Sequence, residues 1–192
     1  MNLPNKLTVL RILLVPFFVA ALLINFPLHH LAALALFGAA SLTDLFDGKI
    51  ARKRGLVTDF GKFADPLADK ILVISALLCF VQMGLCDCVA VIIVLFREFT
   101  VTSIRLIAAS KGKVIAANIW GKVKTVSQMI AIICILVMQI VLDIGALGVP
   151  LPSALGGIFK IIGEVLIWIS TVFTIISGVV YVAQNRQFIS EK

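Results

Sequence analysis

Long apolar runs, separated by short stretches of polar residues, glycine and proline, cover most of this chain. Six runs can be delimited, at residues 7–28, 31–52, 62–84, 88–110, 118–142 and 157–182. A helix of about 20 apolar residues crosses the hydrocarbon core of a bilayer and satisfies its own backbone hydrogen bonds there. The pattern therefore predicts an all-α polytopic membrane protein, a six-transmembrane-helix bundle that forms one membrane domain over residues 1–192.

Composition agrees with a membrane bundle and leaves little material for a separate soluble domain. Hydrophobic residues make up 61% of the chain and charged residues 14%, and the mean hydropathy is +1.13. The first apolar run continues past Ala20 without a cleavage site of small residues, so we interpret it as a membrane helix and not as a signal peptide. The net charge of +7 favours anionic headgroups or phosphate-bearing substrates, although cytoplasmic loops also collect Lys and Arg. No nucleic-acid partner is expected.

The basic residues gather on one side of the predicted bundle. They lie near the two termini and in the connections around 49–62 and 111–124, whereas the loops at 26–31, 82–88 and 143–156 contain no Lys or Arg. Cytoplasmic loops of membrane proteins carry the excess of basic residues. Both termini are therefore predicted to be cytoplasmic, in a protein integral to the cell (inner) membrane.

The cysteines and histidines do not have the number and spacing of a zinc site, which usually needs four regularly spaced ligands. We interpret the cysteines as small apolar residues, and the two histidines as incidental residues of a loop. The residues concerned are Cys79, Cys86, Cys88, Cys134, His29 and His30.

Four aspartates lie at the predicted cytoplasmic ends of the second and third helices. Asp44 and Asp47 are three residues apart and Asp65 and Asp69 are four apart, so each pair shares one helix face. Carboxylates inside a membrane are costly and repel one another unless cations lie among them. Mg²⁺ and Mn²⁺ prefer oxygen ligands, and two such ions make a clamp suited to phosphoryl transfer. The pattern therefore predicts that two divalent cations, Mg²⁺ or Mn²⁺, bind to these aspartates.

Two other interpretations of the aspartates stay open. They could form ion pairs with basic residues nearby, which are Lys49, Arg52, Lys62 and Lys70. They could also be the ion site of a divalent-metal transporter, but the outer halves of the second and third helices carry no acidic or amide residue before Gln82 to continue a transport path.

The spacing Asp44-x2-Asp47-Gly48-x2-Ala51-Arg52-x8-Gly61-x3-Asp65-x3-Asp69 resembles the complete signature of the CDP-alcohol phosphatidyltransferase family. The resemblance implies that metals bound by the four aspartates hold the pyrophosphate of a CDP-linked lipid. It also implies that Asp69 is the general base for an acceptor hydroxyl, which attacks the lipid-side phosphorus as CMP leaves. The positions implied to bind the CDP-lipid are Gly48, Ala51, Arg52 and Gly61.

Other motifs resemble the branch of that family whose acceptor is sn-glycerol 3-phosphate. They begin at Pro4-Asn5-Lys6, Asp65-Pro66-Leu67, Arg97-Glu98-Phe99 and Gly121-Lys122. The implied reaction transfers a phosphatidyl group from CDP-diacylglycerol to sn-glycerol 3-phosphate and gives phosphatidylglycerophosphate and CMP.

The charged residues of the fourth and fifth predicted helices are candidates for the acceptor site, because ionisable side chains within a membrane are functional candidates by default. The expected ligands of the acceptor phosphate are Arg97, Arg105, Lys122 and Lys124. A simpler alternative pairs Glu98 with Arg105, seven residues further on, and Arg97 with another group.

The expected partners are thus CDP-diacylglycerol, glycerol 3-phosphate and membrane lipid, with a homodimer implied by the resemblance. Within the family, a cardiolipin-forming or an inositol-phosphate-using enzyme is the alternative. Outside it, the alternatives are a divalent-metal transporter and a lipid-binding bundle without catalytic activity.

Overall fold

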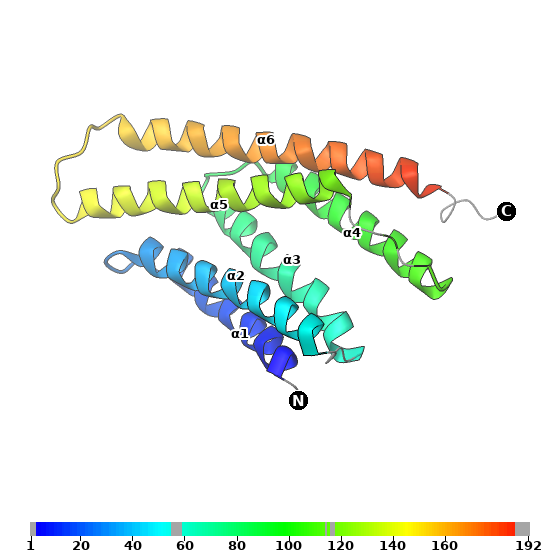
Figure 1. The fold of residues 1–192 in the computed structure, drawn as a ribbon. Coiled ribbons are helices and arrows are strands. Elements are labelled where there is room, and N and C mark those ends of the chain that lie inside the picture. The colour runs from blue at the N-terminus through cyan, green and yellow to red at the C-terminus, as the bar shows by residue number, and fades with distance from the viewer. Residues whose placement is uncertain (1–2, 55–58, 114, 116–117, 187–192) are drawn as a thin grey trace.

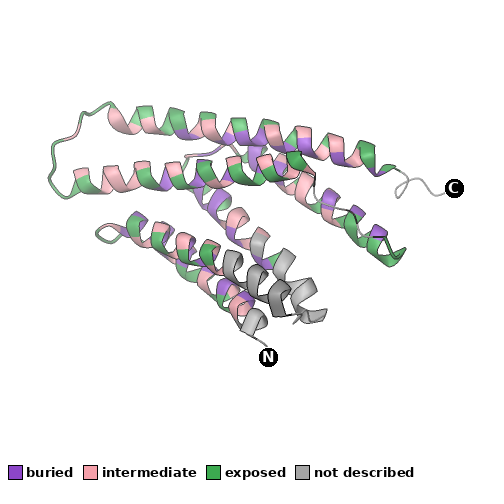
Figure 2. Cartoon of the chain, in the orientation of Figure 1, coloured by how far each residue is buried: buried purple, intermediate pink, exposed green. Residues whose placement is uncertain are grey.

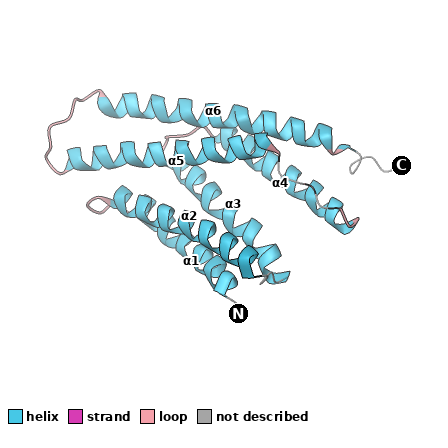
Figure 3. Cartoon of the chain, in the orientation of Figure 1, coloured by secondary structure: helices cyan, strands magenta, loops and turns pink. Residues whose placement is uncertain are grey.

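Six α-helices and no strand make up the part of the chain that the structure, a computed structural model, describes (Figure 1, Figure 3). That part comprises residues 3–54, 59–113, 115 and 118–186, without the side chains of 3–6, 44–54, 59–66 and 69. The helices are α1 (Leu3–Leu23), α2 (His29–Arg54), α3 (Asp59–Gln82), α4 (Cys88–Ser110), α5 (Ile119–Ala146) and α6 (Leu155–Gln184). The predicted all-α fold with six helices is confirmed.

The helix limits differ from the predicted ones by four residues or more at three places. α1 begins at Leu3, four residues before the predicted start. The first helix ends at Leu23, because Pro27 disfavours helical backbone in the residue before it and Leu28 adopts a left-handed conformation with φ of 57°. α5 continues past the predicted end at residue 142 as far as Ala146, before Gly148 with its φ of 103°. The longer α5 brings Asp143 into a helix.

The helices form two antiparallel hairpins with α3 and α4 beside them. α1 packs chiefly against α2, and α5 against α6, while α3 contacts α1 and α4 contacts α6. Figure 1 shows the start of α1 and the end of α6 at one end of the bundle. The α1–α2 turn and the α5–α6 loop lie at the opposite end. This arrangement agrees with termini on one side of a membrane, although the orientation itself stays a prediction.

Large apolar side chains occur both in the interior and on the surface of the described bundle. Figure 2 shows which residues are buried and which are exposed. Inside, Phe18 of α1 and Phe37 of α2 are fully buried with ring centroids 5.7 Å apart. Outside, large side chains such as Phe96 and Ile119 are 75% and 77% exposed. Such a surface is expected of a protein whose solvent is lipid.

Two helices, α5 and α6, are long and apolar enough to cross a membrane along their whole length. The apolar parts of three others are shorter, at Leu7–Leu23, His29–Thr43 and Lys70–Gln82. The count of six membrane spans therefore stays a prediction, whereas the membrane character of the two helices follows from length and composition.

The cysteines agree in part with their interpretation as small apolar residues. Cys79 and Cys86 are buried free thiols, and burial, with the nearby charge of Asp87 adding to it, raises the pKa of Cys86 to about 12. Cys88 is an exposed free thiol. The interpretation of the histidines as loop residues was wrong, because His29 and His30 are the first residues of α2 and are buried.

Candidate functional site

A carboxylate from α4 lies at the centre of a group of cations between four helices. Glu98 Oε1 is 2.7 Å from Lys124 Nζ of α5 and 2.9 Å from Arg97 Nη1, and Glu98 Oε2 is 3.8 Å from Lys70 Nζ of α3. The side chains of Glu98 and Lys124 are only 12% and 7% exposed. We call these four residues the Glu98 cluster.

Hydroxyl groups hold the outer members of the Glu98 cluster. Arg97 Nη2 donates a hydrogen bond of 2.6 Å to Ser177 Oγ of α6. Lys70 Nζ donates to Thr102 Oγ1, and this hydroxyl donates in turn to the Glu98 carbonyl over 2.7 Å. The cluster therefore ties α3, α4, α5 and α6 together by polar contacts.

Two glycines make room for the Arg97 side chain. A Cβ atom on Gly178 of α6 would lie 3.0 Å from Arg97 Cγ. A Cβ atom on Gly121 of α5 would lie 3.7 Å from Arg97 Nη2 and 3.2 Å from Asn118 Oδ1, the oxygen that caps α5 by accepting from the Gly121 N–H. Small residues at these positions allow the helices to approach the arginine closely, as is common in membrane bundles.

Among the described side chains, the Glu98 cluster is rich in cations. Arg97 and Lys124 share the single carboxylate of Glu98, and Lys70, which has a further contact of its own, lies 3.8 Å from it. In addition, the Nε–H of Arg97 is a buried donor without a hydrogen-bond partner in the described part of the chain. Clustered cations and a spare donor are what an anion with several oxygen atoms, such as a phosphate, requires.

Only two of the four predicted acceptor ligands lie in this cluster. Arg97 and Lys124 both contact Glu98. Arg105 is exposed, and its Nε lies 3.2 Å from the hydroxyl of Tyr181, with the guanidinium 5.6 Å from the centre of that ring. Lys122 is exposed on α5. The alternative that paired Glu98 with Arg105 was wrong, because the carboxylate is taken by Lys124, Arg97 and Lys70.

The predicted metal and nucleotide residues lie on α2 and α3, and their side chains are outside the described part of the structure. Asp44, Asp47, Gly48, Ala51 and Arg52 belong to the second half of α2. Gly61, Asp65 and Asp69 belong to the first half of α3. The ion-pair alternative is likewise outside it for Lys49, Arg52 and Lys62. The next residue after Asp69, however, is Lys70 of the Glu98 cluster, so the two groups of charges adjoin along α3.

Sequence reasoning missed the central role of Glu98 and the contribution of Ser177. A signal existed for Ser177, since Ser170, Thr174 and Ser177 are buried hydroxyl residues at helical spacing in an otherwise apolar helix. Arg11 was taken as a basic residue that marks the cytoplasmic side, but its side chain lies inside the bundle with 1% exposure.

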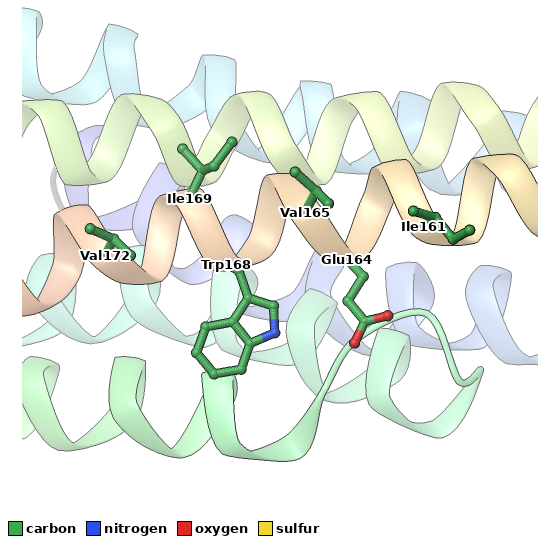
Figure 4. A pocket seen from close by; sticks show the side chains of 6 residues that line it. All are labelled: Ile161, Glu164, Val165, Trp168, Ile169 and Val172. Carbon is green, nitrogen blue, oxygen red and sulfur yellow. The ribbon is translucent and has the colours of Figure 1, made fainter.

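An apolar depression of about 400 Å³ runs along α6, away from the Glu98 cluster (Figure 4). It is lined by Ile161, Glu164, Val165, Trp168, Ile169 and Val172. With one carboxylate among apolar side chains, it suits hydrocarbon and not a phosphate.

Comparison with known proteins assigns the class of this bundle. The family model of CDP-alcohol phosphatidyltransferase matches residues 1–176. The chain belongs to this family, as the spacing of its aspartates indicated. Among its relatives, the CDP-diacylglycerol–glycerol-3-phosphate 3-phosphatidyltransferase of Bacillus subtilis is 41% identical over 196 residues, covering 96% of this chain and 95% of the relative. The protein of the same name from Rickettsia bellii is 36% identical over 187 residues, covering 97% of each chain.

Replacing Glu98 by Gln tests whether the carboxylate holds the bundle together. Removal of one member of a buried ion pair leaves the other charge uncompensated, which costs about 3–5 kcal/mol. We expect Glu98→Gln to lower the thermal unfolding temperature of the purified protein clearly, because Lys124 stays buried. Glu164→Gln, the same change in the partly exposed depression on α6, is the control and should have little effect. Equal unfolding temperatures for the two variants would contradict this role.

Proposed function

We propose that this chain transfers the phosphatidyl group of CDP-diacylglycerol to sn-glycerol 3-phosphate, with release of CMP. Membership of the family supports the use of a CDP-linked lipid. The names of relatives that match almost the entire chain support the acceptor. The observation that carries the proposal beyond the names is the Glu98 cluster, in which Arg97 and Lys124 share one carboxylate and whose member Lys70 directly follows Asp69 in the sequence.

The ends of α2 and α3 have suitable donors for divalent cations. Both helices continue through the motif, so the spacings of three and four residues place each pair of aspartates on one helix face. We assign Asp44, Asp47, Asp65 and Asp69 as the residues that would hold two cations, Mg²⁺ or Mn²⁺. When bound, such ions neutralise charge on the pyrophosphate and orient it for displacement.

The protein's own groups then have distinct tasks. Gly48, Ala51 and Gly61 leave space for the nucleotide beside the helices, and Arg52 offers a planar pair of donors to a phosphate. Asp69 accepts the proton of the acceptor hydroxyl as its oxygen bonds to the lipid-side phosphorus. The bond from that phosphorus to the bridging oxygen breaks, and CMP departs with the bridging oxygen.

The acceptor phosphate is assigned to the Glu98 cluster. Arg97 and Lys124 supply charged donors and share one carboxylate, so two described cations face a single described anion, which favours binding of a phosphate. Because Asp69 directly precedes Lys70 of this cluster on α3, an acceptor bound there would lie near the proposed base. Arg105 and Lys122 are assigned an outer role, attracting the anion toward the membrane surface.

We further propose that residues 1–192 form a single catalytic domain with six spans, with both termini and the active site at the cytoplasmic face of the inner membrane. Acyl chains of the lipid substrate would lie among the apolar helix surfaces. The homodimer implied by the family resemblance stays a prediction.

The reaction is tested by following CMP release from CDP-diacylglycerol with purified protein and a panel of acceptors. We expect release with glycerol 3-phosphate, none after treatment with a metal chelator, and recovery when Mg²⁺ or Mn²⁺ is restored. Asp69→Asn should lose activity by about 100-fold or more, the range of general-base catalysis. Release with phosphatidylglycerol or inositol phosphate in place of glycerol 3-phosphate would assign the chain to another branch. Full turnover by Asp69→Asn would remove this residue from the base role.

The acceptor assignment is tested with two lysines on the same helix. Lys124→Gln removes a charged donor from the cluster, and a hydrogen bond to a charged group contributes about 1.5–3 kcal/mol. We therefore expect the KM for glycerol 3-phosphate to rise about 10-fold or more, with little change in the KM for CDP-diacylglycerol. Lys122→Gln, at an exposed position two residues earlier, is the matched control. Equal effects of the two substitutions on the acceptor KM would argue against the Glu98 cluster as the phosphate site.

The native cysteines allow a test of orientation. Cys88 is exposed and lies at the end predicted to face outward, whereas the buried Cys86 thiol, with its pKa of about 12, stays unreactive. A membrane-impermeant maleimide should label this protein at Cys88 in intact spheroplasts, and the Cys88→Ser substitution should abolish this labelling. Lys111→Cys in the Cys88→Ser background should react only after permeabilisation. Labelling of Lys111→Cys in intact spheroplasts would reverse the proposed orientation.

A further inference from the structure

Two histidines and an aspartate meet at the end of the bundle remote from the aspartate motif. His29 and His30 open α2, and Asp143 lies near the end of α5, 113 residues away from His30 in the chain. One ligand atom from each of the three residues lies within 4.8 Å of the others. His29, His30 and the side chain of Asp143 are 9%, 5% and 13% exposed. From Asp44 they are separated by 14 residues or more of α2, or about 21 Å along a helix.

The hydrogen bonds of His29 determine which nitrogen carries its proton. His29 Nδ1 lies 3.0 Å from the carbonyl oxygen of Ala21, which can only accept, so Nδ1 is the donor. In the neutral ring, Nε2 then bears a lone pair, and it faces Asp143 Oδ1 at 3.8 Å. A lone pair opposite a carboxylate is unfavourable unless a cation or a proton lies between them.

His30 approaches the same carboxylate oxygen. Its Nδ1 is 2.9 Å from Asp143 Oδ1, and its backbone N–H donates to Asp143 Oδ2 over 3.2 Å. The two imidazole rings lie with their centroids 3.8 Å apart. His30 Nε2 is buried and lacks a hydrogen-bond partner in the described part of the chain. When the His30 proton is on Nε2, three electron-rich atoms, His29 Nε2, His30 Nδ1 and Asp143 Oδ1, gather in one place.

The spacing of these atoms suits a tetrahedral metal ion. Zinc binds imidazole nitrogen at about 2.0–2.1 Å and carboxylate oxygen at about 2.0–2.2 Å, which separates neighbouring ligands by roughly 3.3–3.5 Å. The separations of Asp143 Oδ1 from His30 Nδ1 and His29 Nε2, 2.9 and 3.8 Å, lie on either side of that value. A cavity of about 440 Å³, lined by His29 and Asp143 among others, adjoins the ligands and offers a route for the ion and for water as a fourth ligand.

We propose that His29, His30 and Asp143 bind a divalent transition-metal ion of the zinc class, separate from the cations assigned to the aspartate motif. In the metal-bound form, neutral His30 carries its proton on Nε2 and offers the Nδ1 lone pair to the ion, while His29 Nδ1–H stays on the Ala21 carbonyl, a contact that orients the ring. The ion would join the α1–α2 turn to the end of α5. Its place at the far end of α2 makes it a structural ion and not a reactant.

Cobalt titration of the full-length protein in detergent tests this site. The protein is first treated with a chelator to remove bound metal, and Co²⁺ is then added. Co²⁺ in a tetrahedral site with nitrogen ligands absorbs strongly in the visible range. Co²⁺ in a six-coordinate oxygen site, such as four aspartates provide, absorbs weakly. We expect a strong band that saturates with a single Co²⁺ per chain and disappears when Zn²⁺ is added. Zn²⁺ should also raise the thermal unfolding temperature of the wild-type protein.

Variants assign the band to the three residues. Asp143→Asn and His30→Gln should lose it, whereas Glu164→Gln, a carboxylate-to-amide change on α6, should keep it. Absence of the strong band from the wild-type protein would overturn the proposal, and so would its persistence in Asp143→Asn. The wild-type spectrum tests the proposal even if a variant fails to fold. If the three side chains were held only by hydrogen bonds, with His29 protonated, the wild-type protein would give no strong Co²⁺ band.

Discussion

A carboxylate within an apolar bundle stays charged only where cations compensate it, and in this protein one such carboxylate organises four helices. Glu98 of α4 contacts Lys70 of α3 and Lys124 of α5, and its sequence neighbour Arg97 extends the contacts to α6. Hydrophobic burial contributes little to association between helices in lipid, where the surrounding chains are as apolar as the side chains. Polar contacts and close packing therefore set which helices meet, and the Glu98 cluster supplies both through Ser177 and the two glycines beside Arg97.

The same cluster bears on where the two substrates of the proposed reaction would bind. In the proposed reaction, a lipid headgroup and a water-soluble acceptor meet at one point near the membrane surface. The aspartates of α2 and α3 carry negative charge and suit cations, while the Glu98 cluster is rich in described cations and suits an anion. Two neighbouring sites, one for cations and one for an anion, can thus distinguish a metal-bound pyrophosphate from a free phosphate monoester without a separate domain for either.

The fold was largely readable from the sequence because apolar runs of helical length have few alternatives in a membrane. The aspartate motif was readable too, since its spacing alone carries the family resemblance. The sequence did not show which of the candidate acceptor residues, Arg97, Arg105, Lys122 and Lys124, would gather in one cluster, because the direction of each side chain depends on helix rotation. Packing turned Lys124 inward to Glu98 and left Lys122 exposed. His29, His30 and Asp143 could not be linked from sequence, because a contact across 113 residues leaves no local pattern.

The adjacency of Asp69 and Lys70 has a mechanical consequence. Successive residues of an α-helix are rotated by about 100° around its axis, so a helix that turns cannot move one of them without the other. Any rolling of α3 that draws Lys70 away from Glu98 also re-aims position 69. An anion in the proposed acceptor site would compete with Glu98 for its cations. Its binding would then be transmitted through α3, as a rigid helix, to Asp69, the proposed general base.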